Sequence, residues 1–314
     1  GMDLFDGHCD TVSRCWREGW SLRSNPGNVD LERGGRFGAW GQFFALFAAE
    51  EDHPGIALEE VCRAQYTLFQ REMAQNKERM VHCRTGEEAR AAFAAGKGAA
   101  FLSVEGAQLL GCSLEGLERA FRMGVRAVNP VWNHANRLCG SCAEEPERGL
   151  TAQGRTFCRR MEALGMLVDV SHMSDAGFWD VAETLEGPFI ASHSNARALC
   201  PHPRNLTDEM MREIIRRGGV AGINLFRAFL GEDTAGLEAV VAHIEHFLAL
   251  GGEENVALGG DLDGCGDQFP AGFAGIQDME QIVEALLRRN YREELLHAIF
   301  FDNLMRVVNQ VCTM

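Results

Sequence analysis

The 314-residue sequence lacks three features, and each absence argues against one class of protein. It has no apolar run of about 18–20 residues, the length that a membrane-spanning helix requires, so we expect no membrane-spanning segment. It has no excess of basic residues, because 30 Lys and Arg stand against 45 Asp and Glu, a formal net charge of −15. Proteins that bind a phosphate backbone need clustered cations, so we expect no nucleic-acid partner. No glycine-rich turn follows the first strand-like segment, which argues against an open, doubly wound sheet.

Cysteine is too sparse for a disulfide scaffold. The sequence has eleven cysteines, an odd number and a low density for its length. Cys62, Cys158 and Cys312 fall in apolar segments, where a free thiol behaves as a small apolar group. No secretory leader precedes the first strand-like run, and the last residues form no hydrophobic tail for a lipid anchor. We therefore expect a protein of the reducing cytoplasm, with no membrane partner.

Short apolar runs alternate with amphipathic stretches along the chain, which is typical of βα units and a parallel sheet. Polar residues gather at the C-terminal ends of these runs, and the runs themselves are nearly continuous, as in strands buried on both faces. Eight strands are predicted: Leu4–Asp10, Gly41–Ala48, Ala99–Glu105, Arg126–Trp132, Met166–His172, Phe189–His193, Val220–Phe226 and Val256–Asp261.

Helical patterns lie between these strands. Leu114–Gly124 places apolar residues at spacings of three and four and stops at glycine, and Thr207 is a candidate N-cap for the next clear helix. Two further patterns, Ile276–Arg289 and Arg292–Val308, close the chain, and residues 19–38 and 139–150 are predicted to be long loops. The fold class is therefore α/β, a (β/α)8 TIM-type barrel with additional loops and C-terminal helices, in one domain over residues 1–314.

The first predicted strand ends in a histidine and a carboxylate. Residues two apart on a strand face the same way, so His8 and Asp10 project together and Cys9 points to the opposite side. In a barrel the C-terminal strand ends form the floor of the active site. A neutral imidazole beside a carboxylate there can bind zinc or a similar divalent ion. Taken alone, the pair is more simply a hydrogen-bonded structural pair.

The pair is not alone, because other strands also end in ionisable residues. Those residues are Glu105, His172, His193 and Asp261. Burying so many ionisable groups without a partner is costly, and a metal site removes that cost by binding carboxylates and neutral imidazoles directly. The joint pattern predicts a metal site at the C-terminal rim of the barrel.

These motifs together resemble the membrane (renal) dipeptidase family of the amidohydrolase superfamily. The matching motifs are His8-x-Asp10, Val-Glu105-Gly, Asp-Val-Ser-His172, Ser-His193-Ser-Asn and Gly-Gly-Asp261-Leu-Asp-Gly, in order along nearly the whole chain. The resemblance implies a barrel with two zinc ions that hydrolyses dipeptides, and a homodimer.

The resemblance also implies roles for single residues. His8 and Asp10 would hold one zinc ion, His172 and His193 the other, and Glu105 would bridge both. Asp261 would be the acid/base, and Arg204 would bind the terminal carboxylate of the substrate, because it lies eleven residues after His193.

Elementary chemistry is consistent with these roles. Two metal ions about 3.5–4 Å apart can hold a bridging hydroxide and polarise the scissile carbonyl. Asp261 could take a proton from the attacking water and pass it to the leaving amine. The planar guanidinium of Arg204 suits a two-point clamp on a carboxylate, although an arginine after a proline-rich loop is also an ordinary surface residue.

The sequence departs from the family pattern at one position. Members with a substrate-binding histidine carry it just after the fourth strand, where this chain has Trp132, and His134 follows two residues later. The indole N–H of Trp132 could donate a hydrogen bond in its place, or a loop shift could recruit His134.

Lysine is scarce, which separates this sequence from other branches of the superfamily. Many of these begin with His-x-His and bridge their metals with a carboxylated lysine at a strand end. This chain has Asp10 in place of the second histidine and only two lysines, Lys77 and Lys97, so a lysine bridge is excluded.

The leading hypothesis is therefore a dinuclear zinc dipeptidase whose substrates carry a free C-terminal carboxylate, with acceptance of a C-terminal D-residue implied by the resemblance. One alternative keeps the metals but acts on an N-acyl amino acid, a lactone or a cyclic amide. Another is a non-catalytic metal-binding barrel.

Overall fold

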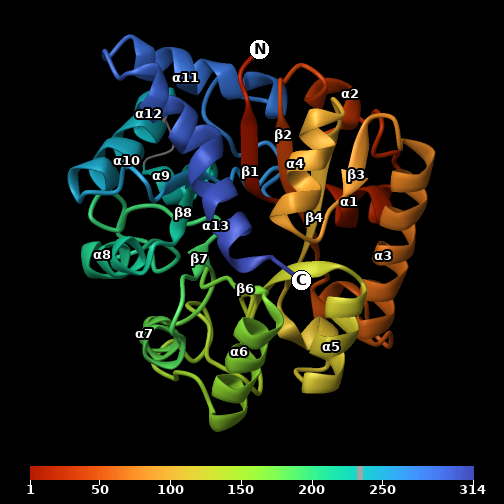
Figure 1. Ribbon diagram of the computed structural model, residues 1–314. Helices are drawn as coiled ribbons and strands as arrows, with labels where there is room; N and C mark the ends of the chain where they lie inside the picture. Colours follow the sequence, from red (N-terminus) through yellow and green to blue (C-terminus); the bar gives the residue numbers. More distant parts are fainter. Residues whose placement is uncertain (232–235) are drawn as a thin grey trace.

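Eight parallel strands form a barrel that is nearly closed. The computed structural model describes residues 1–231 and 236–314 (Figure 1). The strands run in the order β6-β5-β4-β2-β1-β9-β8-β7. A parallel bridge from Asp169, just after β6, to Ile190 of β7 joins the two ends of this path. The strands are β1 Leu4–Cys9, β2 Trp40–Leu46, β3 Met80–His82, β4 Gly98–Glu105, β5 Val125–Asn129, β6 Leu167–Val168, β7 Ile190–Ala191, β8 Val220–Ile223 and β9 Val256–Leu258.

The predicted TIM-type barrel is confirmed, with differences at single strands. All eight predicted strands are present, and β3 is an additional short strand that pairs only with β4. β5 ends at Asn129 rather than at Trp132, because Pro130 has no N–H to extend the ladder. β6 is only two residues long, and His172, with a φ of 79°, could not continue it.

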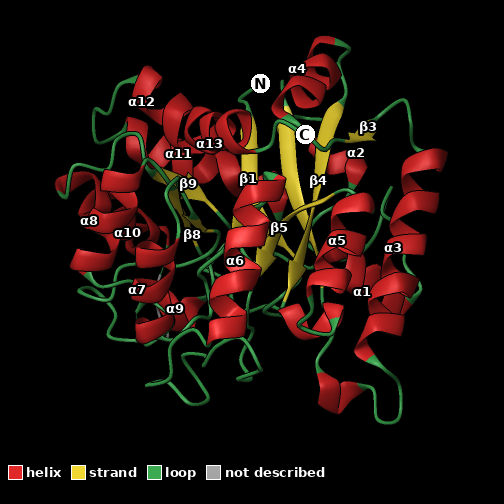
Figure 2. Cartoon of the chain, turned by 60° about the horizontal axis from the view of Figure 1, so that its bottom comes forward, coloured by secondary structure: helices red, strands yellow, loops and turns green. Residues whose placement is uncertain are grey.

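The helices surround the barrel, and Figure 2 shows them outside the strands. Helix α5 begins after its N-cap Ser113, and α8 after the predicted cap Thr207, whose side chain accepts a hydrogen bond from Met210 N. The helices are α1 Thr11–Glu18, α2 Leu31–Gly34, α3 Leu58–Gln75, α4 Gly86–Ala94, α5 Leu114–Arg122, α6 Ala152–Leu164, α7 Asp175–Thr184, α8 Asp208–Arg217, α9 Arg227–Leu230, α10 Leu237–Ala249, α11 Met279–Leu287, α12 Glu293–His297 and α13 Asn303–Val311. Short 3-10 helices occupy Glu50–Asp52, Ala107–Leu110 and Ile276–Asp278, and a π-helical turn, Ala298–Asp302, interrupts the predicted final helix between α12 and α13.

The N-terminal end of the barrel is filled by apolar side chains. Phe5, Phe43 and Phe101 pack on one another with ring centroids 5.2–5.9 Å apart. The other strands add Ala127, Leu167, Ile190, Val220 and Ala257 to the same cluster, and α13 covers it with Leu304, Met305, Val307 and Val308. Since this end is filled, a ligand can enter only at the opposite, C-terminal end of the strands.

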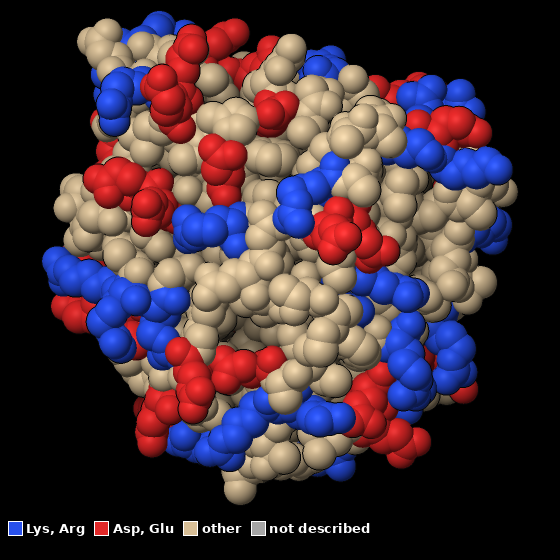
Figure 3. Space-filling view, viewed as in Figure 1, with Lys and Arg blue, Asp and Glu red and all other residues tan. Residues whose placement is uncertain are grey.

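On the face in Figure 3, acidic and basic side chains lie beside one another over much of the area. In residues 1–231 and 236–314, no helix has the length and apolar character needed to cross a membrane. All eleven cysteines are free thiols, and most are buried.

Candidate active site

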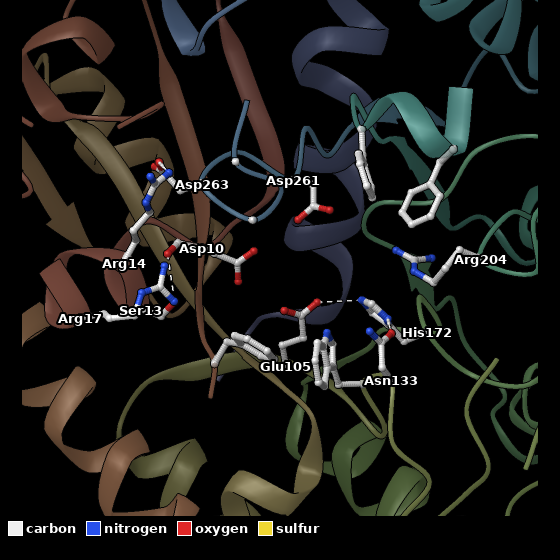
Figure 4. Close-up of a pocket in the computed structure, with 16 residues that line it drawn as sticks. Asp10, Ser13, Arg14, Arg17, Glu105, Asn133, His172, Arg204, Asp261 and Asp263 are labelled. Carbon is white, nitrogen blue, oxygen red and sulfur yellow. Dashed lines mark hydrogen bonds and ion pairs between the residues drawn. The ribbon is translucent and has the colours of Figure 1, made fainter. Parts of the chain in front are cut away.

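A cavity of about 340 Å³ opens at the C-terminal ends of the strands (Figure 4). Carboxylates, a histidine, three arginines and four aromatic side chains surround it. The lining residues are Asp10, Ser13, Arg14, Arg17, Phe47, Glu105, Trp132, Asn133, His172, Arg204, Phe226, Phe229, Asp261, Asp263, Gly264 and Gly266.

The end of β1 turns His8 toward this cavity. Phe5 faces the barrel interior, so strict alternation along β1 would place His8 on the outer face. The pairing register of β1 with β2 shifts between Asp6 and Cys9, and this irregularity turns His8 inward. His8 Nε2 then lies 3.2 Å from Asp10 Oδ2, while Cys9 packs in the apolar core on the other side. Asp6 braces the turn, because it accepts hydrogen bonds from His8 N and Gly260 N.

Glu105, the last residue of β4, lies at the centre of the histidines. Its Oε2 is 3.5 Å from His8 Nε2, 3.0 Å from His172 Nε2 and 3.2 Å from His193 Nε2. The ligand atoms of His8, Asp10 and Glu105 lie within 4.8 Å of one another, and so do those of Glu105, His172 and His193. Glu105 therefore belongs to two overlapping sets of three potential metal ligands.

Hydrogen bonds fix both histidines that follow β6 and β7. Asn133 Oδ1 lies 3.0 Å from His172 Nδ1, and Ser192 Oγ lies 2.7 Å from His193 Nδ1. Asp169 links the ends of β6 and β7, because its Oδ1 accepts hydrogen bonds from Ser171 N and from Ser192 N. Each imidazole therefore presents its Nε2 to Glu105, as in metal sites whose second ring nitrogen is held by a partner.

Asp261, just beyond β9, completes the cluster from the opposite side. Its Oδ1 lies 3.8 Å from His8 Nε2, and its Oδ2 accepts a hydrogen bond of 3.3 Å from Asn224. Asp261 and Asp263 both have positive φ values, 59° and 63°, which are uncommon for residues with side chains. The following Gly264 approaches so closely that a Cβ there would overlap the carboxylates of Asp10 and Asp261. Backbone strain is thus concentrated where the carboxylates converge.

Burial and mutual charge set the protonation of the cluster. Burial lowers the pKa of His172 to about 4 and that of His193 well below its usual range, so both imidazoles are neutral and can bind a metal. Burial, followed by the charge of Glu105, raises the pKa of Asp10 to about 8, and burial also raises the pKa of Asp261. Nearby positive charges, from His8 at Asp10 and from His8 and Arg204 at Asp261, lower these pKa values but do not offset the effect of burial.

The cluster fits a divalent cation. Asp10 Oδ1 is buried and has no hydrogen-bond partner, although a buried carboxylate oxygen normally has one. Neutral imidazole nitrogens and carboxylate oxygens are the ligands that zinc and similar divalent ions accept. His8, Asp10, Glu105, His172 and His193 therefore form a buried metal-binding cluster, and the carboxylate of Asp261 forms a third set of potential ligands with His8 and His193.

Two of the three predicted substrate-binding residues, Arg204 and Trp132, line the cavity, and His134 does not. Arg204 lines the cavity with 6% exposure, and its Nε is buried without a partner, while Nη2 donates to His193 O and Nη1 to Ser194 Oγ. Trp132 also lines the cavity. His134 is not among the described residues that line it, because its exposed ring turns away to Glu51 and Glu144, at 3.0 and 3.1 Å.

Several cavity residues escaped prediction. Asn133, which orients His172, sits in an irregular segment after β5, and only its place beside Trp132 hinted at a role. The sequence spacing could have identified Arg14 and Arg17 on α1. They follow Asp10 by four and seven residues and so lie on the same face of the helix. The aromatic residues Phe226, the N-cap of α9, and Phe229, within α9, also line the cavity.

A family comparison agrees with this geometry. The model of the membrane dipeptidase family (peptidase family M19) matches residues 1–314. The chain belongs to this family. It is a metallo dipeptidase, a hydrolase of peptide bonds, and the family resemblance predicted from the sequence is confirmed.

Individual relatives of this M19 dipeptidase support the assignment. Dipeptidase tcpJ of Claviceps purpurea is 31% identical over 299 residues, which cover 91% of this chain and 69% of that protein. An uncharacterized protein of Klebsiella pneumoniae, encoded in the pqqA 5′ region, is 38% identical over 206 residues, 62% of this chain and 75% of the relative.

Two solved structures share the whole fold. A metallo peptidase from Rhodobacter sphaeroides, crystallised with a phosphinate mimic of the dipeptide L-Ala-D-Ala, is 27% identical, with a TM-score of 0.90 and 99% of each chain covered. The dipeptidase AC, an M19 metallo peptidase, is 28% identical, with a TM-score of 0.90, and the match covers 100% of this chain and 99% of the other.

Proposed function

We propose that this M19 dipeptidase is a dinuclear zinc enzyme that cleaves dipeptides with a free C-terminal carboxylate. The observation that carries the proposal is the position of Glu105 in two overlapping ligand sets, one with His8 and Asp10 and one with His172 and His193. A single carboxylate shared by two sets is the arrangement that links two closely spaced cations.

Zinc suits the two sets because each combines imidazole with carboxylate. Bound zinc ions would polarise the scissile carbonyl and lower the pKa of a water molecule so that it can attack. The protein's part is to present neutral imidazoles in fixed positions. The low pKa values of His172 and His193 and the hydrogen bonds to their Nδ1 atoms serve that purpose.

Asp261 is the proposed acid/base. Its carboxylate lines the cavity, is held by Asn224 and has a raised pKa because it is buried. A carboxylate with a raised pKa is a better base than one in water, and its acid form can return the proton to the leaving amine. Among the described carboxylates that line the cavity, Asp10 and Glu105 are proposed as ligands and Asp263 accepts hydrogen bonds from Thr11 Oγ1 and Asn28 N, which leaves Asp261 for the proton transfer.

Arg204 is the proposed anchor for the C-terminal carboxylate. Its guanidinium lies over the ring of Phe229, 5.0 Å from the centroid, and is held by two hydrogen bonds, so it is fixed before a substrate arrives. A positioned guanidinium with an unpaired Nε suits a carboxylate ligand. Trp132 faces the same cavity and can offer its indole N–H to the substrate.

The stereochemistry proposed for the substrate follows the Rhodobacter sphaeroides relative. That protein was crystallised with a mimic of L-Ala-D-Ala, so we propose that the present enzyme also accepts a D-residue at the C-terminal position. A cytoplasmic location and a homodimeric state stay predictions from the sequence and from the resemblance.

Metal removal tests the proposal directly. The purified protein is stripped with a chelator, its zinc content is measured by mass spectrometry, and hydrolysis of L-Ala-L-Ala and L-Ala-D-Ala is followed before and after zinc is added. We expect activity to disappear with the metal and to return as zinc approaches two ions per chain. Full activity in protein shown to be free of metal would contradict the mechanism.

A further inference from the structure

Helix α1 presents a polar stripe to the cavity. Ser13, Arg14 and Arg17 follow Asp10 by three, four and seven residues, which places all four on one face of the helix. All four line the cavity, although only Asp10 belongs to the metal-binding cluster. The other three therefore face the substrate space from the side of the first ligand pair.

The two arginines of this stripe differ in their partners. Arg14 donates to Asp263 Oδ1 at 3.2 Å, and that carboxylate is completely buried, so the charge of Arg14 is already matched. Arg17 has a single ion pair among the described residues, from Nε to the exposed Glu18 at 3.5 Å. Glu18 is exposed and is not part of the cavity wall, so among the described residues Arg17 has no carboxylate partner within the cavity lining.

Arg17 and Arg204 lie at opposite ends of the cavity. Figure 4 shows Arg14 and Arg17 on one side, Arg204 on the other, and the carboxylates of Asp10 and Glu105 between them. If Arg204 holds the C-terminal carboxylate and the scissile bond lies over the cluster, the N-terminal residue of the substrate extends toward α1. Its side chain then approaches Ser13 and Arg17.

The charge of the cavity favours an additional anion. The lining carries four carboxylates, from Asp10, Glu105, Asp261 and Asp263, and three guanidiniums. A single divalent cation makes the formal charge of this wall positive, and a second makes it more so. A dipeptide whose ends carry opposite charges leaves that excess in place, whereas an acidic side chain reduces it.

We propose that Arg17 makes the enzyme selective for dipeptides with an acidic N-terminal residue, glutamate or aspartate. The guanidinium of Arg17 binds the side-chain carboxylate in the cavity mouth, and Ser13 lies beside it. The inference rests on the proposed function, because that function sets the direction in which the dipeptide lies. Arg17 acts here as a specificity residue and takes no part in bond cleavage.

The test compares glutamate with its neutral isostere. Values of kcat/KM are measured with the zinc-loaded enzyme for Glu-Ala and Gln-Ala, each with L- and D-alanine, for the wild type and for R17M and R17K. R71M, at an exposed arginine of α3 away from the cavity, is the matched control. We expect the wild type to prefer Glu-Ala by about tenfold, the yield of one charge-assisted hydrogen bond. In R17M the ratio of kcat/KM for Glu-Ala to that for Gln-Ala should fall to about one, because only the value for Glu-Ala decreases. R17K should keep part of the preference, and R71M should match the wild type.

Binding gives a second reading that does not depend on turnover. Calorimetry with phosphinate mimics of Glu-Ala and Gln-Ala should show the same loss of preference in R17M. Equal values for the two substrates in the wild type, or an equal fall for both in R17M, would overturn the assignment of Arg17. A failure of the proposed function looks different, because hydrolysis would then persist in protein shown to be free of metal, whereas the comparison of R17M with the wild type reports on Arg17 alone.

Discussion

Gly264 packs so closely against Asp10 that a Cβ atom on the glycine would overlap Oδ2 of that carboxylate. The same Cβ would also overlap Oδ1 of Asp261. The turn after β9 can therefore hold both carboxylates in place only if it carries no side chain at this position. A residue without a side chain thus controls the geometry of the cluster.

The substitution Gly264→Ala should weaken metal binding. The added methyl group must displace Asp10, Asp261 or the turn itself, and disturbing the support of a ligand typically costs about 10- to 100-fold in metal affinity. Zinc titration against a competing chelator measures this loss, and the thermal unfolding curve reports whether the fold persists. Gly236→Ala is the matched control, because a Cβ there meets nothing within 4 Å and its φ is negative. Unchanged zinc affinity in G264A would contradict the proposed support role.

The sequence predicts which residues gather in the cluster because their signal is local. Each of His8, Glu105 and His193 lies within two residues of the end of an apolar strand, and the strand ends of a parallel barrel converge independently of the loops. The structure brings these residues within hydrogen-bonding distance, as the motif pattern predicts. Recognition of the family supplied Arg204, which the strand pattern alone did not identify.

The features that the sequence did not predict depend on contacts between residues far apart in the sequence. His134 was a candidate because of its place after β5, but its ring is held at the surface by Glu51 and Glu144, and no local pattern encodes those partners. The strand Met80–His82 was missed because three residues are too few to show a period, and it is fixed only by its pairing with β4. The π-helical turn Ala298–Asp302 interrupts an otherwise regular apolar pattern.

The substitution Asp261→Asn should separate catalysis from metal binding. An amide keeps the shape and the contact with Asn224 but cannot carry the proton, so we expect kcat to fall by about 100- to 10,000-fold. Zinc content, measured by mass spectrometry, should stay close to that of the wild type. Asp267→Asn, at an exposed position of the same loop, is the control and should keep full activity. A modest loss of activity in D261N would assign the proton transfer to another group.

The substitution Arg204→Ala should remove recognition of the C-terminal carboxylate. We expect kcat/KM for dipeptides to fall by about 10- to 100-fold, the usual effect of losing a charge-assisted hydrogen bond in a buried site. Amide-capped dipeptides should be equally poor substrates of both enzymes, because they offer nothing for the guanidinium to hold. Arg216→Met, on the exposed face of α8, serves as the control. If R204A lowers turnover of free and capped dipeptides alike, Arg204 does not bind the carboxylate.

His82 should make the fold sensitive to acid. Burial lowers the pKa of His82 to about 4, and its Nε2 lies 3.3 Å from Gly124 O. The folded state thus binds a proton less readily than the unfolded chain, whose histidine titrates near pH 6.5. The contribution of neutral His82 is complete above that pH and is lost as the pH falls from about 6.5 toward 4. The shift corresponds to about 2 to 3 kcal/mol at pH 4.5.

The variant His82→Gln isolates this contribution. Its free energy of unfolding, from urea titrations at pH 7 and pH 4.5, should fall less between the two values than that of the wild type. Any loss of packing against Phe69, whose ring centroid lies 5.0 Å away, affects both pH values equally and cancels in the comparison. His297→Gln is the control. His297 is exposed, and Asp3 and Asp302 raise its pKa despite partial burial. The free energy of unfolding of H297Q should therefore fall more between pH 7 and pH 4.5 than that of the wild type. Parallel curves for H82Q and the wild type would show that His82 is not the acid-sensitive group.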